Sequence, residues 1–105
     1  MKLKDEQIEQ LKYTPITLAK CNVFTELNDE GDIIVRIDSI QIAKVNRHKG
    51  LGTLEVKSII EWAKSNGAKG IVIESFRNAI PFWEKMGFDV WDQGSKVSTG
   101  FLELK

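Results

Sequence analysis

The sequence has almost no cysteine, and it lacks any segment that would direct it to a membrane or hold it there. Its single cysteine, Cys21, cannot form a disulfide within the chain, so disulfides do not support the fold. No signal peptide is visible, and no apolar run approaches the length that crosses a bilayer. We therefore expect a protein of the reducing cytoplasm that does not use a membrane as its partner.

An excess of charge of either sign is also lacking, because 15 lysines and arginines face 15 aspartates and glutamates. Without a basic excess to displace counterions, a nucleic acid is not expected as the main partner. The sequence shows no internal repeat, low-complexity tract or Pro/Gly/Ser-rich linker. With 42% hydrophobic and 29% charged residues, residues 1–105 are predicted to form a single domain with one core.

What the sequence does contain is a basic, glycine-rich stretch between a strand-like run and a helix-like run. It reads Arg47-His48-Lys49-Gly50-Leu51-Gly52-Thr53. Its two glycines allow a tight turn, and the helix that starts here would point free N–H groups at a bound anion. Its three basic residues favour a phosphate. A glycine-rich helix entry without a ligand would show the same pattern, so that alternative stays open.

Two better-known glycine motifs do not fit this stretch. A P-loop needs four residues between its glycines and a Lys-Ser/Thr after the second, and neither is present. A dinucleotide-binding fingerprint needs a third glycine or alanine at the position of Glu55. The stretch therefore predicts a phosphate site of another kind.

Before this stretch the pattern predicts a helix, a strand and a bent second strand. Residues 3–13 have apolar residues at helical spacing, and residues 16–27 are rich in strand-forming residues. A turn at 28–32 leads into a strand at 33–45, whose alternation slips by one residue around Asp38. A β-bulge would explain the slip, and so would two shorter strands that meet at a kink.

After the stretch, a helix is predicted from Leu51 to a stop at Asn66-Gly67. Its expected apolar face consists of Gly52, Val56, Ile59, Ile60 and Ala63, and its expected solvent side of Glu55, Lys57, Glu61 and Lys64. The β-branched run at 70–76 predicts a strand covered on both faces. Together with the strand at 33–45 it would form a parallel pair joined by the helix.

The last part of the chain predicts a short helix and a hairpin. The helix would start with Asn78 as N-cap, direct Phe82 and Met86 at the core and stop at Gly87. Strand signals at 88–92 and 97–104 then predict a terminal antiparallel hairpin.

Two stretches resemble motifs of the GNAT superfamily of N-acetyltransferases. One is Arg-x-x-Gly-x-Gly from Arg47, and the other is Asn-Ala-Ile-Pro-Phe-Trp-Glu-Lys-Met-Gly-Phe at 78–88, similar to the family's Asn-Ala-x-x-Phe-Tyr-Glu-Lys-x-Gly-Phe. The similarity covers 33–105 and thins out before residue 33, where the family has further elements on its acceptor side. The resemblance implies an α+β fold: a central, twisted, mixed sheet flanked by helices, with a bulged strand that splays away from the next strand.

The resemblance also implies acetyl-CoA as cosubstrate, without a metal. The backbone of Ile42 and Lys44 would pair with the pantetheine arm, the glycine-rich loop would hold the pyrophosphate, and Asn78 would contact the coenzyme arm. The predicted coenzyme-binding residues are therefore Ile42, Lys44, Arg47, Lys49, Gly50, Leu51, Gly52, Thr53 and Asn78.

Attack by an amine on a thioester needs a proton acceptor, and Asp38 and Glu74 are the predicted catalytic carboxylates. Either could instead be an ordinary solvent-facing strand residue. The family often places a tyrosine as general acid where this chain has Trp83, and an indole is not a useful acid at pH 7. The one tyrosine, Tyr13, lies in the region that matches the family poorly, and Ser75 and Cys21 are weak substitutes.

Two functions follow from the resemblance. The first is an N-acetyltransferase that acts on a primary amine of an unidentified acceptor. The second is a non-catalytic module that binds acetyl-CoA or CoA or serves a regulatory role. Trp83 in place of the tyrosine, together with the reduced acceptor side, favours it. Because the acceptor side is short, we also expect a homodimer that completes it.

Overall fold

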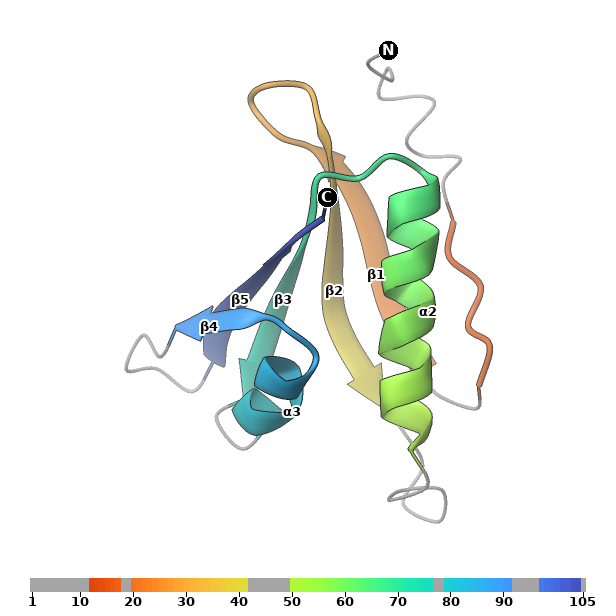
Figure 1. The fold of residues 1–105 in the computed structure, drawn as a ribbon, viewed down its shortest axis with the longest axis vertical. Coiled ribbons are helices and arrows are strands. Elements are labelled where there is room, and N and C mark those ends of the chain that lie inside the picture. Colours follow the sequence, from red (N-terminus) through yellow and green to blue (C-terminus); the bar gives the residue numbers. More distant parts are fainter. Residues whose placement is uncertain (1–11, 18–19, 42–49, 77–78, 92–96, 105) are drawn as a thin grey trace.

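Five strands form one mixed sheet in the computed structural model, which describes residues 12–17, 20–41, 50–76, 79–91 and 97–104. The elements are β1 (Lys20–Leu27), β2 (Ile33–Gln41), α2 (Leu51–Ser65), β3 (Gly70–Phe76), α3 (Ile80–Lys85), β4 (Asp89–Trp91) and β5 (Val97–Glu103) (Figure 1). The strand order is β1-β2-β3-β5-β4, with β2 and β3 parallel and the other neighbours antiparallel. The predicted α+β architecture with a mixed sheet is confirmed.

The first hairpin forms where the turn was predicted. Asn28 Oδ1 accepts the N–H groups of Glu30 and Asp32, at 3.0 and 2.9 Å, and Gly31 takes a positive φ of 80°. These local contacts bring Leu27 opposite Ile33. The turn is thus fixed by residues within it, which explains why the sequence alone reveals it.

The segment before β1 differs from the prediction. β1 starts at Lys20 and not at residue 16, and residues 12–17 form neither helix nor strand. Of the predicted helix at 3–13, residues 3–11 lie outside the described residues, while Lys12 and Tyr13 are not helical. The reason is tertiary: the N–H groups of Ile16 and Thr17 donate to the Glu55 carboxylate of α2 and are therefore not available for strand pairing.

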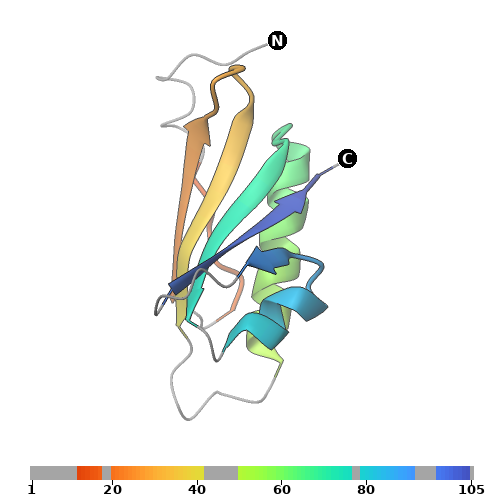
Figure 2. The ribbon, with the colours of Figure 1, turned by 90° about the vertical axis from the view of Figure 1, so that its left-hand side faces the viewer.

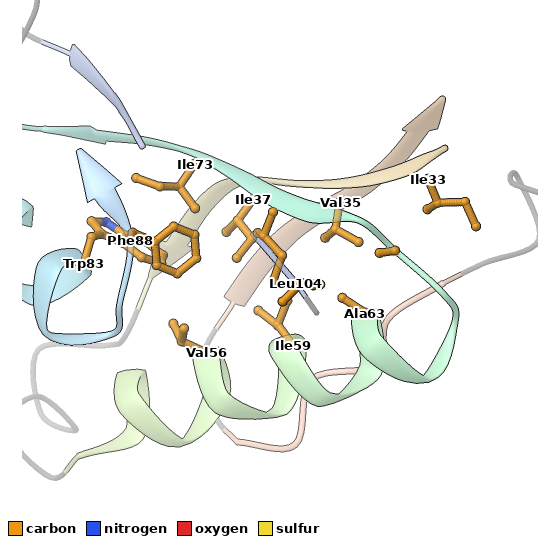
Figure 3. Packing of buried hydrophobic residues seen from close by; sticks show 12 residues of the cluster. Ile33, Val35, Ile37, Val56, Ile59, Ala63, Ile73, Trp83, Phe88 and Leu104 are labelled. Atoms are coloured by element: carbon orange, nitrogen blue, oxygen red, sulfur yellow. The ribbon is translucent and has the colours of Figure 1, made fainter. Parts of the chain in front are cut away.

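Helices α2 and α3 lie against one face of the sheet (Figure 2). Between them and the sheet is the hydrophobic core of Ile33, Val35, Ile37, Val56, Ile59, Ala63, Ala68, Ile71, Ile73, Trp83, Phe88 and Leu104 (Figure 3). Each large aliphatic side chain buried here contributes about 1.5–3 kcal/mol relative to exposure. In the described part of the chain, no helix is long and apolar enough to cross a membrane.

Helix α2 has the predicted length, but one side chain lies on an unexpected side. It ends at Asn66 and Gly67, whose φ is 77°, as the stop signal predicted. Val56, Ile59 and Ala63 are buried as expected, and Ile60 is half-buried. Glu55, however, was predicted to face solvent and is fully buried. The prediction was wrong because the partners of its carboxylate lie far away in the sequence.

The short helix α3 is present, with two corrections. Its N-cap is Ala79, so the predicted cap at Asn78 is wrong, and Asn78 itself lies outside the described residues. Trp83 is its buried residue, whereas Phe82 and Met86 are half-buried beside it. A helix of six residues presents little more than one side chain directly to the core, and Trp83 has that place. The helix stop at Gly87 and the terminal hairpin of β4 and β5 are confirmed.

Candidate functional site

The candidate site lies at the carboxyl ends of the two central parallel strands, β2 and β3, where they separate. The expected parallel pair is present, and it joins Ile34–Ile37 to Gly70–Ile73. The predicted pairing of residues 40–45 with 71–75 is not observed: residues 40 and 41 pair with β1, and residues 42–45 lie outside the described residues. Beyond that point β2 continues beside β1, whereas β3 continues beside β5 (Figure 1). Past Ile37, therefore, neither of these two strands pairs with the other.

An extra residue in β2 coincides with this separation. Val23 pairs with Ile37 and Asn22 pairs with Ser39, which leaves Asp38 as the inserted residue. The predicted β-bulge is thereby confirmed, and the alternative of two strands meeting at a kink is wrong because β2 is continuous. A bulge bends its strand and increases its twist, which re-aims the end of β2 away from β3.

The N-terminus of α2 lies at the same end of the sheet (Figure 1). Gly50 precedes the helix in the left-handed conformation with φ 75°, and a Cβ placed there would meet no atom within 4 Å. The first turn contains no acidic residue. Because the first N–H groups of a helix have no partner within it, the end at Leu51, Gly52 and Thr53 is suited to an anion.

The remaining predicted coenzyme contacts cannot be placed. Ile42, Lys44, Arg47, Lys49 and Asn78 lie outside the described residues. Their roles stay predictions, as do the roles of Gly50, Leu51, Gly52 and Thr53, whose positions the structure gives. His48 also lies outside the described residues.

The two predicted catalytic carboxylates stand at matching positions on the separating strands. Asp38 directly follows Ile37, and Glu74 directly follows Ile73, so each is the first residue past the last parallel pair. Asp38 is exposed. Glu74 is half-exposed, and its Oε1 lies 3.4 Å from Arg36 Nη1. Both are open to solvent, and their catalytic role stays a prediction.

Sequence reasoning missed the most extensively bonded carboxylate of the described chain, Glu55. Its Oε1 accepts the Thr17 N–H at 3.0 Å and the Thr17 hydroxyl at 2.6 Å, and its Oε2 accepts the Ile16 N–H at 3.1 Å. The Tyr13 hydroxyl also donates to Oε2. One signal could have found it: Glu55 lies three residues after Gly52 and four before Ile59, on the apolar side of α2.

All the groups around the Glu55 carboxylate are donors, which suits an ionised carboxylate. Burial raises the pKa of Glu55, but the hydrogen bonds from Thr17, Tyr13 and the Ile16 and Thr17 amides outweigh it and lower the pKa overall. Burial, together with the bond to Glu55, raises the pKa of Tyr13. Burial and the Glu55 charge raise the pKa of Cys21 to about 11. At neutral pH Tyr13 and Cys21 are therefore protonated, and the Tyr13 proton is held by Glu55.

Trp83 and Ser75, the other residues considered for the general acid, are also buried. Trp83 is 5% exposed and packs edge-to-face between Phe82 and Phe88, at 5.1 and 5.2 Å between ring centroids. Ser75 is buried opposite Ser98 on the helix-facing side of β3 and β5. Among the described residues, Ser98 Oγ is a buried polar atom without a hydrogen-bond partner.

The described residues contain no group of three or more histidines, cysteines, aspartates or glutamates arranged to hold a metal ion.

Comparison with known proteins places these features in a family. The family model described as "Acetyltransferase (GNAT) family" matches residues 16–88. The uncharacterized N-acetyltransferase YjcF of Bacillus subtilis is 26% identical over 70 residues, which are 67% of this chain and 50% of YjcF. The chain thus spans about half the length of that relative.

Solved structures share the fold. Arabidopsis thaliana Naa50, in complex with the bisubstrate analogue CoA-Ac-MVNAL, superposes with a TM-score of 0.69 at 16% identity, over 83% of this chain and 66% of that one. An acetyltransferase from Bacillus cereus superposes with a TM-score of 0.57 at 23% identity, over 94% of this chain and 76% of that one. At such identities the likeness concerns the fold.

Proposed function

The chain belongs to the acetyltransferase (GNAT) family, and from this premise we propose that it transfers the acetyl group of acetyl-CoA directly to a primary amine. The observation that carries the proposal is the separation of β2 and β3 at the Asp38 bulge, beside the N-terminus of α2. An opened strand edge next to a helix N-terminus offers backbone groups to a peptide-like arm and N–H groups to a pyrophosphate.

The described residues fit this cosubstrate. The exposed Gly50 turn leaves space where a side chain would project, and the first turn of α2 has no carboxylate to repel a phosphate. In the proposal the amides of residues 49–53 and Arg47 hold the pyrophosphate, the backbone of Ile42 and Lys44 holds the pantetheine arm, and Asn78 contacts that arm. Positioning of this kind can supply much of the acceleration of a bimolecular reaction.

The chemistry then needs few protein groups. The amine nitrogen forms a bond to the acetyl carbonyl carbon, the carbon–sulfur bond breaks, and the sulfur leaves with the electron pair of that bond. Asp38 or Glu74, directly or through water, accepts the proton that the amine loses. Direct transfer is supported by Cys21, whose thiol is protonated at neutral pH and is therefore a poor nucleophile.

A second candidate is a non-catalytic module that binds acetyl-CoA or CoA. Trp83 favours it, because this side chain is packed in the core and brings no acidic hydroxyl to the site. Direct attack with release of a coenzyme thiolate does not strictly require such an acid. We therefore place the enzyme first.

Coenzyme A release across a panel of amines and peptides separates the two candidates. The enzyme predicts release that depends on one acceptor and falls about tenfold or more in Asp38→Asn or Glu74→Gln. Calorimetric binding of acetyl-CoA by these variants, unchanged from wild type, would show that the site is intact. Binding of acetyl-CoA without acceptor-dependent release across the panel would point to the binding module.

Two further expectations stay predictions. A homodimer would give twice the monomer mass by light scattering, and a monomer at high concentration, with and without coenzyme, would contradict it. A cytoplasmic location stays a prediction from the sequence, to be checked by fractionating cells that express the intact gene.

A further inference from the structure

The face of the sheet opposite the two helices carries a mixed set of aromatic and charged side chains. Strand register places Phe24, Arg36, Val72, Phe101 and Asp89 in one cross-strand row on this face. Directly paired residues on neighbouring strands point to the same side of a sheet, and the alternate residues Val35, Ile71 and Ile73 are buried on the helix side. Helices α2 and α3 both lie on that other side (Figure 2).

Large apolar side chains on this face are exposed to solvent. Phe24 is 53% and Trp91 51% exposed, and Ile34, Val72 and Phe101 are half-buried. The Phe101 ring lies over Gly70, where a Cβ would come within 2.4 Å of its Cζ, which confirms that the ring covers the outer face. Exposed apolar side chains from neighbouring strands make a surface that is typical of an interaction site.

Among the side chains that the structure describes, carboxylates outnumber cations on the same face. Glu26 and Glu74 share Arg36, at 3.3 and 3.4 Å, while register places Asp89 and Glu103 on the same side, both exposed. Among the residues whose side chains the structure describes, four carboxylates therefore surround one guanidinium. Aromatic faces also attract ammonium and guanidinium groups. Charge and aromatic chemistry therefore favour the same class of partner.

We propose that this sheet face docks a cationic amphipathic helix of another protein. The apolar side of the helix would cover Phe24, Phe101 and Trp91, and its lysines or arginines would reach the surrounding carboxylates. A helix fits because the face of a sheet is covered well by a helix, whereas an added strand would need a sheet edge. The docking surface adjoins the proposed catalytic site, because Glu74 belongs to both. Docking itself does not require acetyl transfer.

The test uses the full chain and two synthetic peptides. One is a helix with leucines on one side and lysines on the other, and its matched control has glutamates in place of lysines. We expect the lysine peptide to bind in calorimetry, more weakly as salt rises, and the glutamate peptide not to bind. In nuclear magnetic resonance spectra, the indole signal of Trp91 should shift, while those of the other tryptophans, Trp62 and Trp83, should not.

Surface variants locate the binding. Phe24→Ser and Trp91→Ser should each weaken binding about tenfold or more, and the double reversal Glu26→Lys with Glu103→Lys should abolish it. Leu54→Ser and Glu61→Lys are the matched controls, because both residues are exposed on α2, on the far side of the sheet.

Three results would overturn the proposal. The first is no binding of the lysine peptide by folded protein at millimolar concentration. The second is equal binding of the glutamate peptide, or equal weakening by the α2 controls. The third is a dimer of the chain that Phe24→Ser dissociates, which would assign the face to a second copy.

Discussion

The Tyr13 hydroxyl donates a hydrogen bond to the buried Glu55 carboxylate across 42 residues of sequence. Together with the Ile16 and Thr17 contacts, this bond fixes residues 13–17 against helix α2 without any regular secondary structure. The Tyr13 ring also packs edge-to-face on Trp62, at 5.6 Å between centroids. A single carboxylate thus ties the segment before β1 to the helix that begins at the candidate site.

Tyr13 should ionise only well above the ordinary tyrosine pKa of about 10. It is the one tyrosine of the chain, so tyrosinate ultraviolet absorbance reports it alone. Because its pKa is raised on folding, its contribution to stability is complete below pH about 10 and is lost as pH rises through the folded pKa. Titration with an ordinary midpoint in folded protein would contradict the Tyr13–Glu55 contact, and denatured protein is the control.

Glu55→Gln should lower the free energy of unfolding by about 1.5–3 kcal/mol, because a carboxamide NH2 would face groups that are themselves donors. Glu61→Gln, exposed on the same helix, should change it by no more than about 0.5 kcal/mol. Urea unfolding measures both. The pKa of Glu55 is lowered on folding, so its contribution is present above pH about 4 and is lost as pH falls below that value. Equal effects of the two variants would argue against a special role for Glu55.

Gly50 and Gly67 offer a matched test of the proposed pyrophosphate site at the N-terminus of α2. Their φ values are 75° and 77°, they flank the two ends of α2, and a Cβ at either would meet nothing within 4 Å. Alanine at either position should therefore lower the free energy of unfolding by a similar amount, about 1–2 kcal/mol, because only the left-handed backbone conformation is disfavoured. Only Gly50→Glu should strongly weaken acetyl-CoA binding in calorimetry, since it adds a negative charge beside the helix N-terminus. Equal loss of acetyl-CoA affinity in Gly67→Glu would contradict the proposed pyrophosphate site.

Ser98→Ala should leave stability unchanged or raise it by up to about 1 kcal/mol, because its buried hydroxyl has no hydrogen-bond partner among the described residues. Ser75→Ala, directly across on β3, should lower stability, since Ser75 does have an interaction partner. Thermal unfolding of the two variants gives the comparison. A large loss in Ser98→Ala would show that its hydroxyl has a partner after all.

The sequence by itself determined the features that depend on neighbouring residues. The turn at 28–32, the bulge at Asp38 and the ends of α2 at Gly50 and Gly67 follow from alternation, spacing and glycine positions. The turn and the helix ends are fixed by interactions within a few residues, so their signals are local. The bulge forms against β1, but the slipped alternation of β2 already marks it in the sequence. The glycine-rich loop and the 78–88 stretch pointed to the family in the same way.

Tertiary structure alone decided the features whose partners lie far apart along the chain. It buried Glu55 under residues 13–17, placed β5 between β3 and β4, and packed Trp83 in the core. It also aligned Asp38 with Glu74 at the point where their strands separate. A helix pattern shows which side of a helix is apolar, but it cannot show that distant donors will surround one carboxylate there. Burial of that charge becomes favourable only when the folded chain brings all of its hydrogen-bond donors together.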